Sequence, residues 1–228
     1  MGDNNEMDDD RMIMKKSLST LIAERLKQNI WNRDIQLGER LVESEQAERF
    51  DVSRSTIREA LKLLEYKGLV VTKARRGTYV SRFSKKDLKE IIDLRILIET
   101  KAFINALSRL NEHHFKHLEN VLALMKEKAE EKNWNDLFDL DMKFHSYVVN
   151  LCGNSRMIKI YNSTQTQTRA YLGYIDKYYS NHHAFYEEHI ELFSTLKTED
   201  PNRLKEVLKN HIEYADNKLI TGTKVVMR

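Results

Sequence analysis

The chain has 228 residues, of which 41% are hydrophobic and 32% are charged, and it contains only seven glycines and one proline. This length allows two domains with separate cores, and the shortage of glycine and proline favours long helices. No apolar run approaches the roughly 20 residues of a transmembrane helix, and the first ten residues are acidic where a signal peptide is basic. These features argue against a membrane protein. With a single cysteine, Cys152, they predict a cytoplasmic protein.

Positive charge is concentrated in one part of the chain. Residues 11–82 carry 16 Lys or Arg and nine Asp or Glu, whereas residues 83–228 carry 22 and 21 and residues 1–10 carry five acids and no base. Such a basic segment is expected where a protein faces the phosphates of a nucleic acid.

The N-terminal third of the chain shows three helical patterns. Residues 1–14 have no periodicity and predict a disordered acidic tail. Apolar residues at helical spacing then predict helices from residue 17 to about 31–34, from 43 to 50, and from 54 onward, with Ser53 as the N-cap of the last one. Gly68 is expected to end this third helix in a left-handed conformation.

Two β-rich runs follow the third helix, at residues 69–73 and 78–82, and Gly77 lies in the turn between them. Three helices and a two-stranded hairpin predict a winged helix-turn-helix domain over residues 15–82, a fold that reads DNA grooves. The alternative is a small helical domain with a solvated basic face.

Exposed polar residues of this domain are candidates for DNA contact. Arg54 and Arg58 are predicted to contact bases, because a guanidinium group can bond guanine at two points. Phosphate contacts are predicted from the start of the third helix and from the wing, at Ser53, Ser55, Thr56, Lys73, Arg75 and Arg76.

From residue 84 onward only helical patterns are found. Ser84 and Asp87 form a capping-box pattern at the start, and Asp200-Pro201 supplies an N-cap and a proline at the first helical position. The predicted helices are 84–109, 112–131, 134–152, 155–180, 184–197 and 201–220. The chain is therefore predicted to be mainly α, with an all-α antiparallel bundle of about six helices over residues 83–222.

Four polar residues lie on apolar stripes of this bundle: Asp141, His145, His189 and His211. A buried carboxylate is costly unless it is paired or binds a metal. Three imidazoles and a carboxylate suit Zn²⁺, Ni²⁺, Fe²⁺ or Mn²⁺. The alternative for each histidine alone is a hydrogen-bonded core residue.

The N-terminal motifs resemble the DNA-binding domain of the GntR family of bacterial transcription regulators, over residues 17–82. They are Leu41-Val-Glu-Ser-Glu-Gln-Ala-Glu48, Val52-Ser-Arg-Ser-Thr-Ile-Arg-Glu-Ala-Leu61, Leu64-Glu-Tyr-Lys-Gly-Leu69 and Arg76-Gly-Thr-Tyr-Val80. The resemblance implies that Arg54 and Arg58 contact bases and that Gly77 shapes the wing. The chain departs from the family pattern at Arg33-Asp34, where glycine is usual, and at Val42, where proline is common.

The C-terminal motifs resemble the FCD ligand-binding domain of the FadR-like branch, over about residues 84–220. They are Asp141-Met-Lys-Phe-His145, Asn150-Leu-Cys-Gly-Asn154, Glu188-His-Ile190 and the later His211. The resemblance implies that the aspartate and the three histidines bind a divalent metal that helps to hold a small carboxylate effector.

Further residues are predicted to line the effector cavity. Asp93-Leu-Arg95-Ile-Leu-Ile-Glu99 resembles the first helix of that domain, and Arg95 lies on its apolar stripe. Arg95 can therefore clamp a carboxylate or form a salt bridge with Glu99. Gln165, Thr168 and Arg169 interrupt the inward pattern of segment 155–180 and are predicted to line the same cavity.

These patterns predict a homodimeric DNA-binding regulator, because a twofold dimer can read a palindromic operator. The family resemblance implies that this regulator is a repressor. A bound effector would change operator affinity by binding the two states differently. Two alternatives remain. One is a metal-dependent hydrolytic enzyme, whose metal activates water, and the other is a DNA-binding protein whose metal-free helical domain only dimerises.

Overall fold

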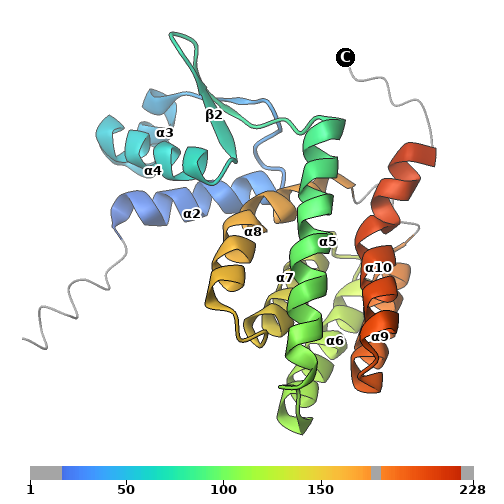
Figure 1. The fold of residues 1–228 in the computed structure, drawn as a ribbon. Coiled ribbons are helices and arrows are strands. Elements are labelled where there is room, and N and C mark those ends of the chain that lie inside the picture. Colours follow the sequence, from blue (N-terminus) through green and yellow to red (C-terminus); the bar gives the residue numbers. More distant parts are fainter. Residues whose placement is uncertain (1–16, 176–180, 222–228) are drawn as a thin grey trace, which may run out of the picture. The chain divides into compact units, whose positions relative to one another are not determined.

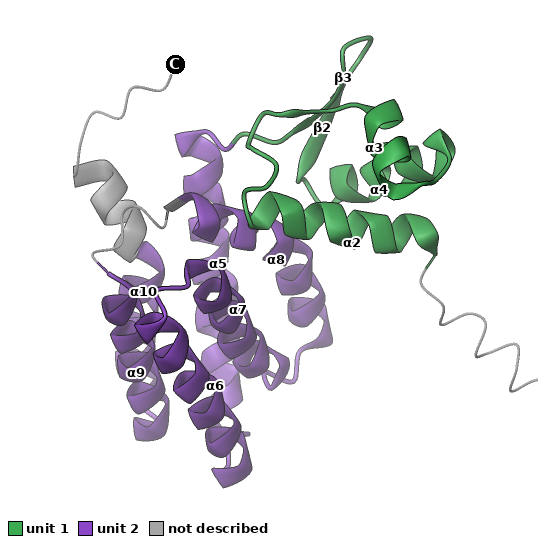
Figure 2. Cartoon of the chain, turned by 180° about the vertical axis from the view of Figure 1, so that it is seen from behind, with its two compact units in different colours: residues 1–82 green, residues 83–228 purple. Residues whose placement is uncertain are grey.

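The structure, a computed structural model, describes residues 17–175 and 181–221. It divides into two compact units, residues 1–82 and 83–228, which have different colours in Figure 2. The predicted acidic tail at residues 1–14 and the end of the predicted helix 155–180 lie outside the described residues.

Unit 1 contains three helices, α2 (Leu18–Trp31), α3 (Glu43–Phe50) and α4 (Arg54–Tyr66). Helix α4 packs against α2 and α3. Its inward face is fully buried, and the residues that form it have the helical spacing seen in the sequence: Ile57, Ala60, Leu61 and Leu64. The opposite face of α4 is therefore presented to solvent.

The turns of unit 1 depend on left-handed residues. Gly68, whose φ is 72°, follows the C-cap of helix α4, and the last carbonyls of the helix accept bonds from the Gly68 and Leu69 amides at 2.9 and 3.0 Å. Arg33 has a φ of 65°, a left-handed conformation that glycine adopts more readily than arginine. Asp51, with a φ of 51°, makes the turn between α3 and α4.

The wing is a three-stranded antiparallel sheet in the order β1-β3-β2. Strands β2 (Val70–Lys73) and β3 (Gly77–Val80) form the predicted hairpin, with Gly77 at a φ of 99°. The third strand, β1 (Arg40–Leu41), pairs with Tyr79 and Thr78 of β3. The two-stranded wing was an incomplete prediction, because a two-residue strand is too short to show the alternation that marks a strand.

In the described part of unit 2, every regular element is a helix, as predicted. The helices are α5 (Lys85–Leu107), α6 (Glu112–Glu130), α7 (Trp134–Asn150), α8 (Ser155–Ile175), α9 (His182–Thr198) and α10 (Pro201–Thr221). The predicted capping box is present at the start of α5, where the Ser84 hydroxyl accepts from the Asp87 amide and the Asp87 carboxylate accepts from the Ser84 amide.

Helix α7 is central in this bundle, because it packs against α5, α6 and α8, while α10 packs against α5 and α9 (Figure 1). The inward face of α7 combines large apolar side chains with two polar ones: Leu137, Phe138, Phe144 and Val148 with Asp141 and His145. The core of the bundle therefore surrounds a polar group.

Candidate DNA interface and metal centre

The N-terminal end of α4 presents a group of hydroxyls. Ser53 caps the helix by accepting from the Thr56 amide at 3.2 Å, and its Oγ also lies 2.7 Å from Ser55 Oγ and 2.8 Å from Thr56 Oγ1. Arg54 is exposed beside them. A helix N-terminus with exposed hydroxyl and guanidinium groups can bind phosphate oxygens.

Arg58, the second predicted base-contacting residue, has an internal partner. Its Nη2 and Nε donate to the two carboxylate oxygens of Glu43 at 2.6 and 3.1 Å. The Glu43 carboxylate raises the pKa of Arg58. This exposed ion pair links α3 to α4 and holds the guanidinium group in one position, so base contact by Arg58 requires exchange of the Glu43 partner.

The wing presents the predicted basic residues Lys73, Arg75 and Arg76 to solvent. Tyr79 supports them, because its hydroxyl donates to the Arg76 carbonyl at 3.1 Å and its ring lies 5.2 Å from Lys73 Nζ. The structure adds a basic residue that the sequence patterns did not indicate, Arg40 of β1. Its guanidinium group lies against Gly77, so closely that a Cβ there would be 3.1 Å from Arg40 Nε.

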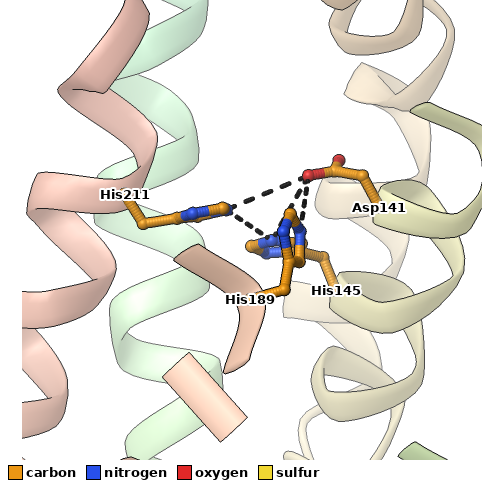
Figure 3. A group of neighbouring side chains, drawn as sticks. All are labelled: Asp141, His145, His189 and His211. Atoms are coloured by element: carbon orange, nitrogen blue, oxygen red, sulfur yellow. Dashed lines mark hydrogen bonds and ion pairs between the residues drawn. The ribbon is translucent and has the colours of Figure 1, made fainter. Parts of the chain in front are cut away.

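In unit 2, the four predicted metal ligands come together although they belong to three helices. Asp141 and His145 are on α7, His189 is on α9 and His211 is on α10 (Figure 3). Each is buried, and one ligand atom from each lies within 4.8 Å of the others. Asp141 Oδ1 is 3.0, 3.7 and 3.9 Å from Nε2 of His189, His145 and His211.

Two of the three imidazole rings are held at Nδ1 from outside the group. Nδ1 of His145 is 2.6 Å from Glu99 Oε2, and Nδ1 of His189 is 2.8 Å from the Phe185 carbonyl. Both partners are oxygen acceptors, so these two Nδ1 atoms carry protons. Nδ1 of His211 has no hydrogen-bond partner among the described residues and lies 3.5 Å from Glu188 Oε2.

The ionisation of the group fits this arrangement. Burial and the neighbouring histidines 189 and 145 lower the pKa of His211 well below its usual value, which leaves the ring neutral. Burial alone would raise the pKa of Asp141, yet His145, His189 and Arg95 hold this pKa far below its ordinary value. The group therefore combines a neutral His211 with an ionised Asp141.

The predicted effector residues do not all face the same place. Arg95 is buried and donates to Glu99 Oε1 at 2.7 Å, the salt bridge left open by the sequence. Gln165 accepts from Ser146, the residue after His145, at 3.4 Å. Arg169 is also buried, but it donates to Asp139 Oδ1 at 2.6 Å and to the Asn135 carbonyl at 3.0 Å, outside the four-residue group.

Some buried polar atoms around this region have no hydrogen-bond partner within the described part of the chain: Asp141 Oδ2, Gln165 Nε2 and Thr168 Oγ1. Gln165 and Thr168 share one face of α8, which packs against α5 and α7. Buried polar groups are rarely left unsatisfied in folded proteins, so these atoms suggest a ligand or water at this face of α8.

Two family models match the chain, one for each unit. Residues 18–80 match the model "Bacterial regulatory proteins, gntR family". Residues 90–214, more than half of the chain, match the model "FCD domain". The chain is a GntR-family transcriptional regulator with an FCD domain.

Relatives agree with this assignment. The chain is 31% identical over 192 residues to an uncharacterised HTH-type transcriptional regulator, YdhC, of Bacillus subtilis, covering 82% of this chain and 83% of the relative. It is 25% identical over 216 residues to the gluconate operon transcriptional repressor of Bacillus licheniformis, covering 92% and 88%. A GntR regulator structure from Rhodococcus shares the fold, with a TM-score of 0.78 at 23% identity, covering 92% of this chain and 100% of that one.

The assignment makes this GntR-family chain a DNA-binding regulator and not an enzyme, which removes the hydrolase alternative. Among the described residues, no helix is long and apolar enough to cross a membrane.

The sequence did not reveal the partner residues that orient the predicted site residues Arg58, His145 and His189. The sequence patterns indicate Glu99 only as a partner of Arg95, and they do not indicate Glu43 as a partner of Arg58 or the Phe185 carbonyl as a partner of His189. A sequence signal existed for Glu99 alone, because it lies one helical turn after Arg95 on the same apolar stripe. Partners from another helix leave no such spacing.

Proposed function

We propose that this regulator binds a divalent transition metal through Asp141, His145, His189 and His211, and that a small carboxylate effector held near the metal controls operator affinity. The observation that supports the metal most strongly is the convergence of four buried ligand atoms within 4.8 Å of one another, with His145 and His189 held at Nδ1 from outside the group. Metal-binding histidines in proteins are oriented in this way.

The ligand atoms also have a suitable spacing. His145 Nε2 and His211 Nε2 are 3.0 Å apart, and His189 Nε2 and Asp141 Oδ1 are 3.0 Å apart. Bonds of about 2.0–2.1 Å from one ion would place its ligands roughly 3–3.5 Å from one another. Without a cation these two contacts are hydrogen bonds, and a bound ion would replace them. Zn²⁺, Ni²⁺, Fe²⁺ or Mn²⁺ suits the donor set.

A metal experiment tests the proposal directly. Protein purified without a chelator should contain about one transition metal per chain by elemental analysis, and His189→Ala should lose it. His113→Ala changes an exposed histidine of α6 and serves as the matched control. A wild-type protein that neither retains metal nor gains thermal stability when Zn²⁺ or Mn²⁺ is added would contradict the proposal and favour the metal-free dimerisation domain.

The effector would bind on the α5 and α8 side of the metal. Arg95 supplies a buried positive charge there, and Gln165 Nε2 and Thr168 Oγ1 supply polar groups that lack hydrogen-bond partners among the described residues. Arg169 is the weakest member of this set, because Asp139 already neutralises it. Since the Bacillus licheniformis relative is named for the gluconate operon, sugar acids are the first probes, and release of operator DNA on their addition would show repression relieved by the effector.

Unit 1 would supply the DNA contacts, with Arg54 and Arg58 at bases and with Ser53, Ser55, Thr56, Lys73, Arg75 and Arg76 at phosphates, while Gly77 shapes the wing. In domain terms, residues 15–82 would read DNA and residues 83–222 would bind the effector and dimerise. Such a regulator acts in the bacterial cytoplasm, where the operator is.

A homodimer would form through the exposed face of α5. Leu97 is 70% exposed on this face, next to Leu94, and Glu90 and Lys101 flank the two leucines. When two copies of this helix pair antiparallel about a twofold axis, Leu94 meets Leu97 of the other copy and Glu90 meets Lys101. The stripe is therefore complementary to itself, as a twofold interface requires.

Charge reversal tests this interface. Glu90→Lys or Lys101→Glu alone should weaken the dimer in sedimentation experiments, and the double variant should restore it, because the charges again oppose. Leu97→Glu should give monomers, whereas Leu124→Glu, at a 46% exposed leucine of α6, should not. A Leu97→Glu protein that remains dimeric would place the interface elsewhere.

A further inference from the structure

Glu99 connects two groups to which the proposed function gives different roles. Its Oε1 accepts from Arg95 Nε at 2.7 Å, and its Oε2 lies 2.6 Å from His145 Nδ1. The carboxylate is 0% exposed, and Arg95 and Glu99 occupy successive turns of α5 while His145 comes from α7. One buried carboxylate thus serves the candidate effector clamp and a candidate metal ligand at once.

We infer that Glu99 is a positioning residue that holds His145 in its metal-binding tautomer and masks Arg95, so that binding of an anionic effector depends on bound metal. This inference rests on the proposed metal and effector sites. It goes beyond them because it assigns a role to a residue that contacts neither the cation nor the effector.

The first half of this role follows from hydrogen bonding. A carboxylate can only accept at His145 Nδ1, so the proton stays on Nδ1 and the Nε2 lone pair is free for a cation. Arg95 Nε donates to the other oxygen of Glu99 at 2.7 Å, and this buried ion pair leaves Oε2 as the acceptor for His145. Outer partners of this kind are typically worth 10- to 100-fold in metal affinity.

The second half follows from charge. Arg95 is buried and already donates to Glu99, so an entering acid must compete with this carboxylate for the arginine. A divalent ion would add two positive charges to the same buried region, and the Nδ1–H of a cation-bound His145 would become a stronger donor to Glu99. Arg95 is then freer to bind the acid.

The test compares three variants. Glu99→Gln removes the charge and leaves one acceptor oxygen for two donors, while Glu99→Asp keeps the charge and is the conservative rescue. Glu188→Gln is the matched control, because Glu188 also faces a histidine of the group, at 3.5 Å from His211 Nδ1. Zn²⁺ affinity is measured for each by competition with a chromophoric chelator. Glu99→Gln should bind Zn²⁺ about 10- to 100-fold more weakly than wild type, with partial recovery in Glu99→Asp and a smaller loss in Glu188→Gln.

Masking of Arg95 is tested with acetate and its neutral analogue acetamide. In the presence of a metal chelator, acetate should raise the melting temperature of Glu99→Gln above the value in acetamide, because Arg95 is released. Wild type should show this difference only when loaded with Zn²⁺. Equal responses of the metal-free wild type and Glu99→Gln would overturn the masking.

A third measurement does not depend on metal. Imidazole ¹⁵N spectra of the metal-free protein should show the His145 proton on Nδ1 in wild type and Glu99→Asp, and a mixture of tautomers in Glu99→Gln. If wild type binds Zn²⁺ but Glu99→Gln keeps the wild-type affinity and spectrum, the inference fails and the metal site stands. If wild type binds no Zn²⁺, the proposed function fails. In that case, a Glu99→Gln spectrum identical to that of wild type would also show that Glu99 does not fix the tautomer of His145.

Discussion

Each unit contains an arginine–glutamate ion pair, which is exposed to solvent in unit 1 and buried in unit 2. In unit 1, Arg58 and Glu43 join two helices at the surface, with 2.6 Å between Nη2 and Oε2. In unit 2, Arg95 and Glu99 are 2.7 Å apart in the core. Water can replace either partner of the surface pair, so that pair contributes little to stability and its arginine remains available to DNA. The buried pair cannot be broken without leaving a charge in the core.

Replacing the two arginines should show the largest difference between the units. Arg95→Met should lower the free energy of unfolding by about 3 kcal/mol or more, because Glu99 keeps a buried charge without its cation. Arg58→Met is the matched surface variant and should change stability far less. Urea unfolding in the presence of a chelator checks both, and equal losses would mean that burial does not distinguish the pairs.

Arg54→Ala should affect DNA binding and leave stability unchanged, because its side chain is exposed at the start of α4. Loss of a guanidinium contact to a base should weaken specific operator binding about 10- to 100-fold, with little effect on nonspecific DNA. Gel-shift titrations with a selected operator and with random DNA separate the two effects. Retained sequence preference would show that Arg54 does not read bases.

Lys73→Ala and Arg75→Ala should have a smaller and less selective effect. A lost phosphate contact weakens binding to all sequences and reduces the slope of log affinity against log salt by about 1. Fluorescence anisotropy at several salt concentrations measures that slope. An effect limited to one operator base would contradict phosphate contact.

The smallest expected effect concerns the capping box of α5. Ser84→Ala should cost about 1 kcal/mol, a typical value for a lost N-cap. Hydrogen bonds from Ser84 lower the pKa of Asp87, so this part of the stability is present at neutral pH and is lost as the pH falls below about 4, through the folded-state pKa. Urea midpoints of wild type and Ser84→Ala should therefore converge in acid.

The sequence predicted elements whose signal is local. Helix α4 was predicted from the spacing of Ile57, Ala60 and Leu64 and from the cap at Ser53, and Asp141 with His145 was visible as a polar pair one turn apart. The sequence did not predict contacts between distant residues that no period links. Glu99 meets His145 across 46 positions, and Glu43 meets Arg58 across 15. Such pairs are fixed by helix packing, which the chain does not reveal one element at a time.

The short strand β1 has a consequence for folding. Arg40 and Leu41 precede the hairpin by about 30 positions, yet they hydrogen-bond to β3 and complete the sheet. Two-stranded hairpins are marginal in water on their own, and they gain stability from a third strand or from packing against a helix. The wing hairpin has both, because β1 pairs with β3 and β2 packs against α4, so it should form only together with them. A synthetic peptide of residues 69–82 should remain a random coil.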